Sequence, residues 1–352
     1  MLTRLTLANF RNLDDTIWEP GPGPHLILGP NGAGKTSLLE SVYVVATTRS
    51  FRTPRLTECS SHGRSDFLIC AEVDRNRRSR LTVGLAATGM HRSVNEAGTP
   101  LMEHLRVQPV VAWTATEGSL LTGAPEGRRR FIDQGIVSAR PAALDVLARY
   151  RRALAQKRQL LADRESGLKA WNEVVAREAS ALMELRKDYL SDLSEQLAAV
   201  VTDLDLELPT IHLRYRPSIS RDTDAEAVFE ELERVREQER SEARPLLGPH
   251  RDEMEIRWGR HPIKSVGSAG ERKVLGLLIS AARGRVLAAA DREPIYLLDD
   301  ADSELDTERL EAIWSLFRDS GQVFVSSNRP NAWKADSTTT RWVLKSGSIS
   351  PD

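Results

Sequence analysis

Residues 29–36 read Gly29-Pro30-Asn31-Gly32-Ala33-Gly34-Lys35-Thr36 and fit the pattern G-x-x-x-x-G-K-[ST] at every position. In such a loop, glycines let the backbone wrap around phosphate with its N–H groups pointing inward. An apolar run, His25–Leu28, precedes the loop, and a segment of helical composition, Ser37–Ala46, follows it. A strand leading in and a helix leading out direct the positive end of the helix dipole at the anion. The stretch therefore predicts an α/β fold in which these residues bind the phosphates of ATP.

Two residues of this loop and two distant acids have side chains suited to particular parts of the nucleotide. Lys35 is expected to reach the terminal phosphates, and the Thr36 hydroxyl is expected to bind Mg²⁺. The apolar run Ile295–Leu298 ends in Asp299 and Asp300. In ATPases with such a loop, the first acid at the strand end holds Mg²⁺. We therefore predict Asp299 as a metal ligand beside Thr36, and Asp300 as the group that orients or deprotonates the attacking water. The predicted catalytic residues are Lys35, Asp299 and Asp300.

Two further segments resemble loops of ABC-type ATPases. Ser303-Glu304-Leu305-Asp306 follows the acidic pair and resembles the S-A-L-D loop of that class. Ser268-Ala269-Gly270-Glu271 lies upstream and fits the signature S-x-G-[QE], which in this class contacts ATP held by the other subunit. The resemblance implies that Ser268 and Gly270 bind the γ-phosphate at a helix N-terminus. A plain helix N-cap, with Ser268 and Glu271 as a capping box, is the alternative.

The composition is that of a folded protein without a membrane anchor. The chain has 352 residues and a formal net charge of −1, with 40% hydrophobic and 28% charged residues. At roughly 150 residues per domain, this length predicts about two domains. No stretch approaches the roughly 18 uninterrupted apolar residues of a membrane span, and the polar, alternating N-terminus is not a signal-peptide core. The two cysteines, Cys59 and Cys70, form neither a disulfide framework nor a zinc quartet, so a cytoplasmic protein is expected.

The hydrophobic period divides the chain into three parts. The first hundred residues read mainly as strands, among them Asp66–Val73, Arg80–Leu85 and His91–Asn95. From about Ala142 the period becomes helical, and strands alternating with helices return after Gly248. We therefore predict an α/β, ABC-type P-loop ATPase head, with a mixed sheet, helices and an antiparallel β subdomain, interrupted by an inserted α-helical lobe. The predicted parts are residues 1–115 with the phosphate loop, residues 116–246 as the lobe, and residues 247–352 with the signature loop and the acidic strand.

Five further stretches carry motifs of one family. They are Asn9-Phe10-Arg11-Asn12-Leu13, Ser50-Phe51-Arg52-Thr53, Gly127–Asp133, Tyr150–Gln159 and Gly248-Pro249-His250-Arg251-Asp252. In this order, and over nearly the whole chain, they resemble the RecF family of bacterial recombination and replication-repair ATPases, which are related to SMC proteins. The resemblance implies a weak DNA-dependent ATPase of the cytoplasm and nucleoid. ATP would join two copies in a two-fold dimer that clamps DNA, often at single-strand/double-strand junctions, and hydrolysis would release the DNA. Mediators of the RecO and RecR type are implied as partners in recombinase loading.

The chain departs from ABC ATPases at two positions. The Gln that often precedes the helical lobe falls on Ala112 or Trp113, and the His after the strand that follows the acidic one falls on Ser327. RecF-like proteins often lack both groups, so the resemblance stands. How water and γ-phosphate are sensed is left open, and we expect slow turnover. Asp300 stands where Glu is common in ABC ATPases, so its shorter carboxylate lies farther from the phosphate.

Basic residues gather at the start of the lobe. They are Arg128, Arg129, Arg130, Arg149, Arg151, Arg152, Lys157 and Arg158. We predict that they face the phosphates of duplex DNA, which gives salt-dependent affinity without sequence readout. The alternative, equally open for each residue, is a solvated helix face that pairs in part with the acidic segment 222–242. For His250, Arg251 and Asp252 we expect hydrogen bonds that order a loop, rather than a metal site.

Two other classes of function share part of this pattern. A transporter ATPase subunit has the same loops, but the long helices and dense arginines of residues 116–246 exceed the compact helical subdomain expected there. A small-molecule kinase or a nucleotide-binding scaffold would have no use for the signature loop and the S-E-L-D loop. A DNA-binding repair ATPase is therefore favoured, with a transporter ATPase subunit as the alternative.

Overall fold

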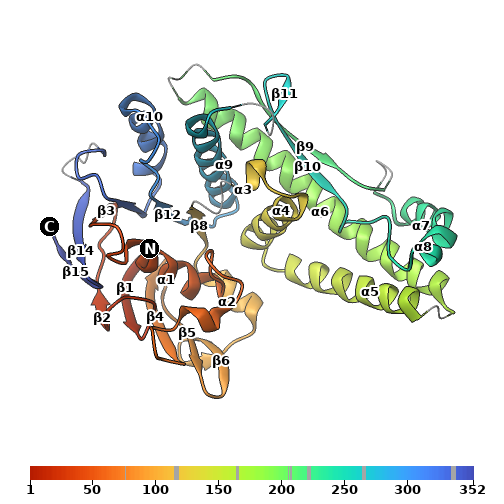
Figure 1. Ribbon diagram of the computed structural model, residues 1–352, viewed down its shortest axis with the longest axis horizontal. Coiled ribbons are helices and arrows are strands. Elements are labelled where there is room, and N and C mark those ends of the chain that lie inside the picture. The colour runs from red at the N-terminus through yellow and green to blue at the C-terminus, as the bar shows by residue number, and fades with distance from the viewer. Residues whose placement is uncertain are drawn as a thin grey trace. The chain divides into compact units, whose positions relative to one another are not determined.

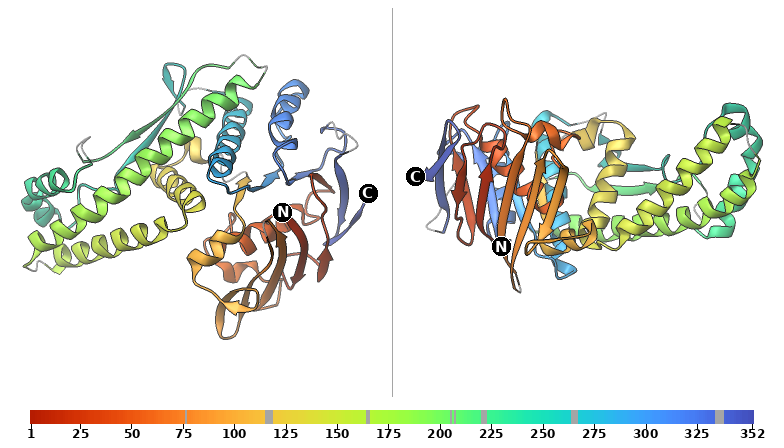
Figure 2. Two further views of the ribbon diagram at one scale, coloured as in Figure 1. Left: turned by 180° about the vertical axis from the view of Figure 1, so that it is seen from behind. Right: turned by 90° about the horizontal axis from the view of Figure 1, so that it is seen from below.

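The computed structural model describes residues 1–75, 77–114, 119–163, 166–204, 206, 208–219, 223–263, 267–333 and 338–352. The chain divides into two compact units. The head unit consists of Met1–Leu121, Gln196–Leu208 and Gly267–Asp352, and the helical unit consists of Thr122–Glu195 and Pro209–Val266. Figure 1 and Figure 2 show the elements of each unit, which we describe separately.

The head unit contains a six-stranded sheet whose central strands are parallel. Its strands, in spatial order, are β15 (Ser348–Pro351), β14 (Thr340–Lys345), β3 (Pro24–Leu28), β13 (Val323–Ser327), β12 (Ile295–Asp299) and β8 (Val110–Trp113). β15 is antiparallel to β14, and the other neighbouring pairs are parallel. In this register Asp299 lies opposite Ser326, and Ser327 lies opposite Leu28. The carboxyl ends of β3, β12 and β13 therefore meet at one edge, where open α/β sheets bind ligands.

A second sheet of the head unit is antiparallel. Its order is β2 (Thr16–Trp18), β1 (Leu2–Ala8), β4 (Phe67–Asp74), β5 (Arg78–Ala86), β6 (Gly89–Val94) and β7 (Ala97–Gly98). Helix α1 (Lys35–Thr47) contacts β12 and β13 of the parallel sheet and β4 and β5 of the antiparallel sheet. Leu38, Leu39 and Val42 of α1 are buried in the core that both sheets share. A helix covered on all sides needs apolar residues around its circumference, and this burial fixes the start of α1 next to the phosphate loop.

The other helices of the head unit lie on two sides of the parallel sheet. A short 3-10 helix, Leu56–Cys59, precedes α2 (Leu101–Val107), which contacts α1 and β6. Helix α9 (Ala269–Ala289) contacts β8 and α10 (Thr307–Arg318). Along β12, Leu297 lies in the core shared with α1, whereas the Tyr296 ring contacts Phe317 of α10 at a centroid distance of 5.2 Å. Because successive strand residues point to opposite faces, α1 and α10 lie on opposite faces of this sheet (Figure 1).

The helical unit combines long helices with a small sheet. Its helices are α4 (Pro125–Ala139), α5 (Ala143–Asp163), α6 (Leu168–Thr202, of which the residues from Gln196 belong to the head unit), α7 (Ala225–Arg234) and α8 (Arg236–Glu242), with the short α3 (Ser119–Thr122) before α4. Its sheet has the order β11 (His261–Pro262), β10 (Glu253–Trp258) and β9 (Ile211–Arg216). Leu147 and Leu154 of α5, Leu182 of α6 and Val228 and Leu232 of α7 form its apolar core.

The division of the chain differs from the predicted parts at three places, the smallest being that the first head segment ends at Leu121 rather than at residue 115. Residues 247–266 lie in the helical unit, whereas the prediction assigned them to the head. The physical reason is strand pairing, because β10 pairs with β9 from Glu253 opposite Arg216 to Trp258 opposite Ile211. The segment Gln196–Leu208, predicted as part of the lobe, lies in the head unit. The head is thus assembled from three segments of the chain rather than two.

The elements that differ from the expected pattern include three in the helical unit. Helix α4 carries two glycines and three consecutive arginines and was not predicted. Strand β9 was not predicted either, although its residues alternate between half-buried and exposed. The expected helix near Ala225–Glu239 is divided at Val235, whose φ and ψ of −95° and 1° end α7. Among the described residues, no helix combines the length and the apolar character that a membrane crossing requires.

Candidate nucleotide-binding site

The phosphate loop connects β3 to α1 through backbone conformations that favour glycine. Gly34, the residue before α1, has a φ of 110°, and a Cβ there would lie 2.7 Å from Leu13 Cδ2. A Cβ at Gly29 would overlap the carbonyl oxygen of Leu344. No side chain caps the first turn of α1. The N–H groups of that turn therefore remain free to bind an anion, as the sequence pattern predicts.

Lys35 folds back onto the loop. Its Nζ donates hydrogen bonds to the carbonyl oxygens of Gly29 at 2.7 Å and Pro30 at 3.0 Å. Burial lowers the pKa of Lys35, and the carboxylates of Asp300, Asp299 and Asp302 oppose this shift. The ammonium group therefore lies among carboxylates. Its N–H donors can bind phosphate oxygens in place of the loop carbonyls.

Thr36 and Asp299 meet as the sequence predicts for a magnesium site. Thr36 Oγ1 lies 2.9 Å and 3.0 Å from the two carboxylate oxygens of Asp299, and Ser326 Oγ donates to Asp299 Oδ1 at 2.7 Å. Burial raises the pKa of Asp299, while the hydrogen bonds from Ser326 and Thr36 act to lower it. A hydroxyl and a carboxylate are hard oxygen donors of the kind that Mg²⁺ uses together with phosphate and water. These residues therefore fit the ion.

Asp300 is held by its backbone. Its φ of 50° is left-handed, its N–H donates to Ser326 Oγ at 3.0 Å, and its carbonyl accepts a hydrogen bond from Lys273 Nζ at 2.8 Å. Lys273 also donates to the carbonyl oxygen of Ser303 at 2.8 Å and to the Ser303 hydroxyl. Lys273 thereby fixes the loop after β12 to the first turns of α9. No motif in the sequence assigned this role to Lys273.

Ser268 is the N-cap of α9 and forms the capping box that was the alternative to the signature function. Its Oγ accepts from the N–H of Glu271 at 3.2 Å, and its own N–H donates to Glu271 Oε2 at 2.6 Å. Ser268 is exposed. A Cβ at Gly270 would lie 3.0 Å from the carbonyl oxygen of Glu304, so glycine allows close approach of the S-E-L-D loop. Capping and contact with a second subunit are compatible, since the helix tip faces solvent.

One cleft of about 1010 Å³ brings most of these residues together. Its walls include Asn31, Gly32, Gly34, Lys35, Thr36, Asp299 and Asp300 from the predicted set, and also Ala269, Arg272, Lys273, Ser303 and Glu304. Gly29, Pro30 and Ala33 lie in the loop behind this wall, and Ser268 and Gly270 flank Ala269 without lining the cleft. The phosphate loop, the two acids and the start of α9 therefore share one surface of the head unit.

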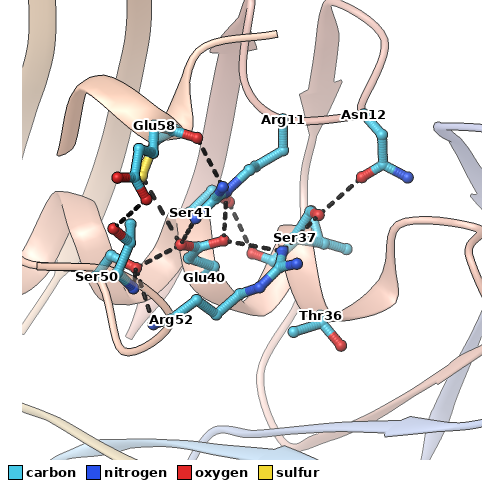
Figure 3. Close-up of polar contacts among 12 residues, drawn as sticks. Arg11, Asn12, Thr36, Ser37, Glu40, Ser41, Ser50, Arg52 and Glu58 are labelled. Carbon is cyan, nitrogen blue, oxygen red and sulfur yellow. Dashed lines mark hydrogen bonds and ion pairs between the residues drawn. The ribbon is translucent and has the colours of Figure 1, made fainter. Parts of the chain in front are cut away.

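A fully buried carboxylate, Glu40, supports the loop from one turn inside α1 (Figure 3). Arg11 donates two hydrogen bonds to it at 2.9 Å and 2.6 Å, Arg52 donates at 3.3 Å, and the Ser50 hydroxyl donates at 2.5 Å. Burial and the Glu40 carboxylate raise the pKa of the Cys59 thiol to about 11, so this thiol lies protonated beside Glu40. Glu40 thus joins the Asn9–Leu13 and Ser50–Thr53 motifs to α1 and holds Arg11 and Arg52 at the wall of the cleft.

Asn12 braces the loop directly. Its Nδ2 donates to the carbonyl oxygen of Gly32 at 2.9 Å, and its Oδ1 accepts from the Ser37 hydroxyl at 2.8 Å. Figure 3 shows Asn12 and Ser37 pointing toward one another next to Thr36. Asn12 therefore connects the phosphate loop to the first turn of α1, a role that the motif alone did not reveal.

The two positions that depart from ABC ATPases are filled by different chemistry. Trp113, at the end of β8, lines the cleft, and a Cβ at Gly276 of α9 would overlap its indole ring. Ser327, at the end of β13, donates to Asp302 Oδ2 at 2.8 Å. Asp302 is fully buried. The first position is thus an apolar wall between the sheet and α9, and the second anchors the loop after β12.

In the helical unit, the predicted basic cluster is only partly available to DNA. Arg128 is buried and forms two hydrogen bonds with Glu253, at 2.6 Å and 2.8 Å. Lys157 is fully buried against Glu239 at 2.7 Å. The prediction that these two residues face DNA phosphates is wrong, because internal carboxylates already neutralise them. The alternative of pairing with the acidic segment 222–242 holds for Lys157.

The Gly248–Asp252 motif orders the helical unit as expected. Asp252 accepts hydrogen bonds from Arg186 Nη1 at 3.2 Å, from the backbone N–H of Ser218 at 2.8 Å and from the Tyr215 hydroxyl. Arg186 also pairs with Asp133 of the Gly127–Asp133 motif at 3.0 Å. Among the described residues, no group of three or more His, Cys, Asp or Glu side chains is placed to hold a metal ion. Through its pairing with Asp133 and Asp252, the buried Arg186 connects the Gly127–Asp133 motif to the Gly248–Asp252 motif.

Comparison with known proteins adds relatives and folds to this geometry. A family model described as an AAA domain matches residues 4–86. The DNA replication and repair protein RecF of Shewanella baltica is 31% identical over 340 residues, which cover 94% of this chain and 93% of that protein. The protein of the same name from Geotalea daltonii is 30% identical over 336 residues, which cover 93% of this chain and 92% of the relative.

Solved structures share the fold. A structure of the recombination mediator protein RecF-ATP in the RecFOR pathway has a TM-score of 0.88 and 21% identity, and covers 100% of this chain and 97% of its own. An SmcHead bound to the C-winged helix domain of ScpA has a TM-score of 0.56 and 14% identity, with 99% and 95% coverage. The predicted fold class, an ABC-type P-loop ATPase head with an inserted lobe, is confirmed.

Proposed function

Because this chain belongs to the RecF family of DNA replication and repair proteins, we propose that it is an ATPase whose two copies close around ATP and clamp DNA. Hydrolysis then releases the DNA, and the cycle assists recombinase loading with mediators of the RecO and RecR type. We propose the cytoplasm as its location and weak, DNA-stimulated turnover as its activity. The alternative of a transporter ATPase subunit is not favoured.

One observation supports this proposal above the others. The phosphate loop, the Thr36–Asp299 pair and the start of α9 line a single cleft of the head unit. In a two-fold dimer each surface patch meets its own copy. Because the α9 tip and the phosphate loop lie on the same surface, the tip of each copy can contact the phosphate loop of the other copy.

Within each copy, the residues of the cleft have distinct roles in our proposal. The N–H groups of the loop and Lys35 Nζ bind the β- and γ-phosphates, and Asn12 and Glu40 hold the loop in place. Thr36 Oγ1 and the Asp299 carboxylate would hold Mg²⁺. An ion held there would supply positive charge to neutralise the charge that develops during phosphoryl transfer. Asp300 orients the attacking water, and Lys273 fixes its backbone.

The contribution of the second copy is Ser268 with the free N–H groups at the start of α9. This helix has 21 residues, so its dipole is fully developed, and its tip is exposed. A γ-phosphate placed there would complete the coordination of the nucleotide only after dimerisation. ATP would then stabilise the dimer through binding energy, and ADP would not.

The decisive experiment measures dimerisation and hydrolysis together. We expect light scattering to show a dimer with ATP and Mg²⁺ but a monomer with ADP. We also expect ATPase activity to rise when duplex, single-stranded or junction DNA is added. The Asp300→Asn variant should still dimerise but hydrolyse about 10²–10⁴-fold more slowly. A protein that remains monomeric with ATP and Mg²⁺ would refute the clamp, and turnover that ignores all three DNA forms would refute DNA dependence.

A further inference from the structure

A second cavity, of about 480 Å³, lies within the helical unit. It is lined by Ala124, Pro125, Glu126, Arg129, Arg158, Arg244, Pro245, His250, Arg251 and Glu253. Three separate segments build it: Ala124 with the start of α4, the C-terminal half of α5, and the stretch from Arg244 to the first residue of β10, which carries the Gly248–Asp252 motif. Four arginines from these segments converge on one hollow.

The carboxylates at this cavity are already engaged. Glu253 pairs with Arg128, Glu126 pairs with Arg130 at 2.9 Å, and Arg244 pairs with Glu242 at 2.6 Å. In the part of the chain that the structure describes, no carboxylate lies within ion-pair distance of the remaining three cavity arginines. These are Arg129, Arg158 and Arg251.

The other groups of the cavity add no negative charge. Burial lowers the pKa of His250 to about 4, assisted by the nearby Arg158 and Arg251, so the ring is neutral at physiological pH. Arg129 donates one hydrogen bond to the carbonyl oxygen of Asp252 at 2.8 Å. The nearby Glu242 carboxylate acts on Arg251 electrostatically, but it already pairs with Arg244. The three guanidinium groups still repel one another, and an external anion would relieve this repulsion.

The cavity wall is held rigid by buried contacts behind it. Tyr150 Oη lies 2.9 Å from His250 Nδ1 and accepts the backbone N–H of His250 at 3.2 Å. A Cβ at Gly248, whose φ is 133°, would lie 2.9 Å from the Tyr150 hydroxyl. The neighbouring Asp252 is fixed by Arg186, Tyr215 and the backbone of Ser218. The Gly248–Asp252 motif therefore places Arg251 and His250 at fixed positions, which lowers the entropic cost of binding a ligand there.

Helix α4 adds a second source of positive potential. It begins at Pro125, has 15 residues, and no side chain caps its first turn. Its first residues, Pro125 and Glu126, belong to the cavity wall. N–H groups of a first helical turn and arginine side chains together are the usual donors to phosphate oxygens in nucleic-acid complexes.

We propose that this cavity binds a phosphate group of the DNA backbone, with Arg158 and Arg251 as the principal contacts. The inference rests on the proposed DNA binding and assigns it a particular site. Arginine favours this ligand because its planar group donates two parallel hydrogen bonds to phosphate. Arg151 lies two helical turns before Arg158 on α5 and is exposed, so the basic face of α5 continues away from the cavity, as a run of successive phosphates requires.

The test compares two double variants of the full-length protein with ATP and Mg²⁺. Arg158→Ala with Arg251→Ala removes two cavity arginines. Arg214→Ala with Arg240→Ala removes two exposed arginines of the same unit that belong neither to the cavity wall nor to the predicted basic cluster. Affinity for a duplex is measured over a range of salt concentrations, and melting temperatures verify that both proteins are folded. The cavity variant should lower the slope of log K against log salt by about 1 for each phosphate that the protein no longer neutralises, and the control should retain the wild-type slope.

Each outcome decides between the two proposals. A wild-type protein that fails to bind duplex DNA overturns both the DNA clamp and the cavity inference. Equal slopes in the cavity variant and the control, with wild-type DNA binding intact, overturn the cavity inference alone. Loss of binding to a polyglutamate peptide in the cavity variant, with an unchanged slope for DNA, would assign the cavity to an acidic protein segment instead.

Discussion

Lys35 has the most direct consequence at the scale of single residues. Its Nζ lies within the loop and donates hydrogen bonds to the carbonyl oxygens of Gly29 and Pro30. A hydrogen bond from a charged group contributes about 1.5–3 kcal/mol. Lys35→Met should therefore lower ATP affinity by about 10–150-fold, measured by calorimetry. The matched variant Lys345→Met, at an exposed lysine of β14, should bind as the wild type does. Unchanged affinity in Lys35→Met would contradict the phosphate-loop assignment.

The buried carboxylate of Asp299 should reduce the free energy of unfolding at neutral pH. Burial raises its pKa above the ordinary value of 3.8, so the folded state disfavours the charged form. A carboxyl with a raised pKa contributes its full stability only below 3.8, and this contribution is lost as the pH rises through the folded pKa. Asp299→Asn should accordingly increase the free energy of unfolding at neutral pH, and the gain should shrink as the pH falls toward 3.8. Denaturant titrations of both proteins across this range measure it, and a variant less stable than the wild type at neutral pH would refute the argument.

The sequence was most informative where chemistry is local. A short motif and an acidic strand end were enough to predict that the loop residues and the acids at the end of β12 lie together, as they do in one cleft. Glu40 could not, since a glutamate inside a helical segment reads as a solvated residue, and its partners Arg11 and Arg52 are distant in sequence. Lys273 was overlooked for the same reason, because its partners Asp300 and Ser303 come from another segment. Ion pairs and hydrogen bonds between residues of different segments depend on how these segments pack. No local sequence pattern reveals that packing.

At the scale of elements, hydrophobic period predicted the buried strands and the long helices. β3, β12 and β13 are buried, mainly apolar runs, and α5 and α6 have sustained helical spacing. The pattern of β9 was present in Ile211–Arg216, whose apolar residues alternate with basic ones, but a single edge strand gives a weak signal. Residues 247–266 were placed in the wrong unit because only the pairing of β10 with β9 reveals where they belong.

The packing of α9 against β8 predicts how a substitution in α9 changes the stability of the protein. A Cβ at Gly276 would overlap the indole ring of Trp113, which is buried at the wall of the cleft. Gly276→Ala should therefore reduce the free energy of unfolding by about 1–3 kcal/mol, because an overpacked core must shift. Gly127→Ala in α4 meets nothing within 4 Å and should instead add about 0.5–1 kcal/mol through helix propensity. Chemical denaturation compares the two, and equal effects would show that the packing of Trp113 does not constrain α9.

At the scale of the whole molecule, one feature separates a clamp from an ordinary nucleotide-binding protein. The exposed tip of α9 and the phosphate loop belong to the same head unit and line or flank the same cleft. This arrangement admits two mechanisms with different stoichiometry. Either the tip serves its own nucleotide, or it serves the nucleotide of a second copy. Hydrolysis by a single species does not distinguish these mechanisms, since both predict that Lys35 and Ser268 are needed for turnover.

Mixing two inactive variants distinguishes them. Lys35→Met binds ATP more weakly but keeps an intact tip, whereas Ser268→Arg keeps the phosphate loop but places a bulky cation at the tip of α9. If the site is shared, a mixed dimer has one complete site, formed by the loop of the Ser268→Arg copy and the tip of the Lys35→Met copy. ATPase activity and ATP-dependent cross-linking should therefore reappear on mixing, although each variant alone has neither. A mixture that stays inactive, while Ser268→Arg alone still binds ATP, would mean that each chain completes its own site and that ATP does not join the copies.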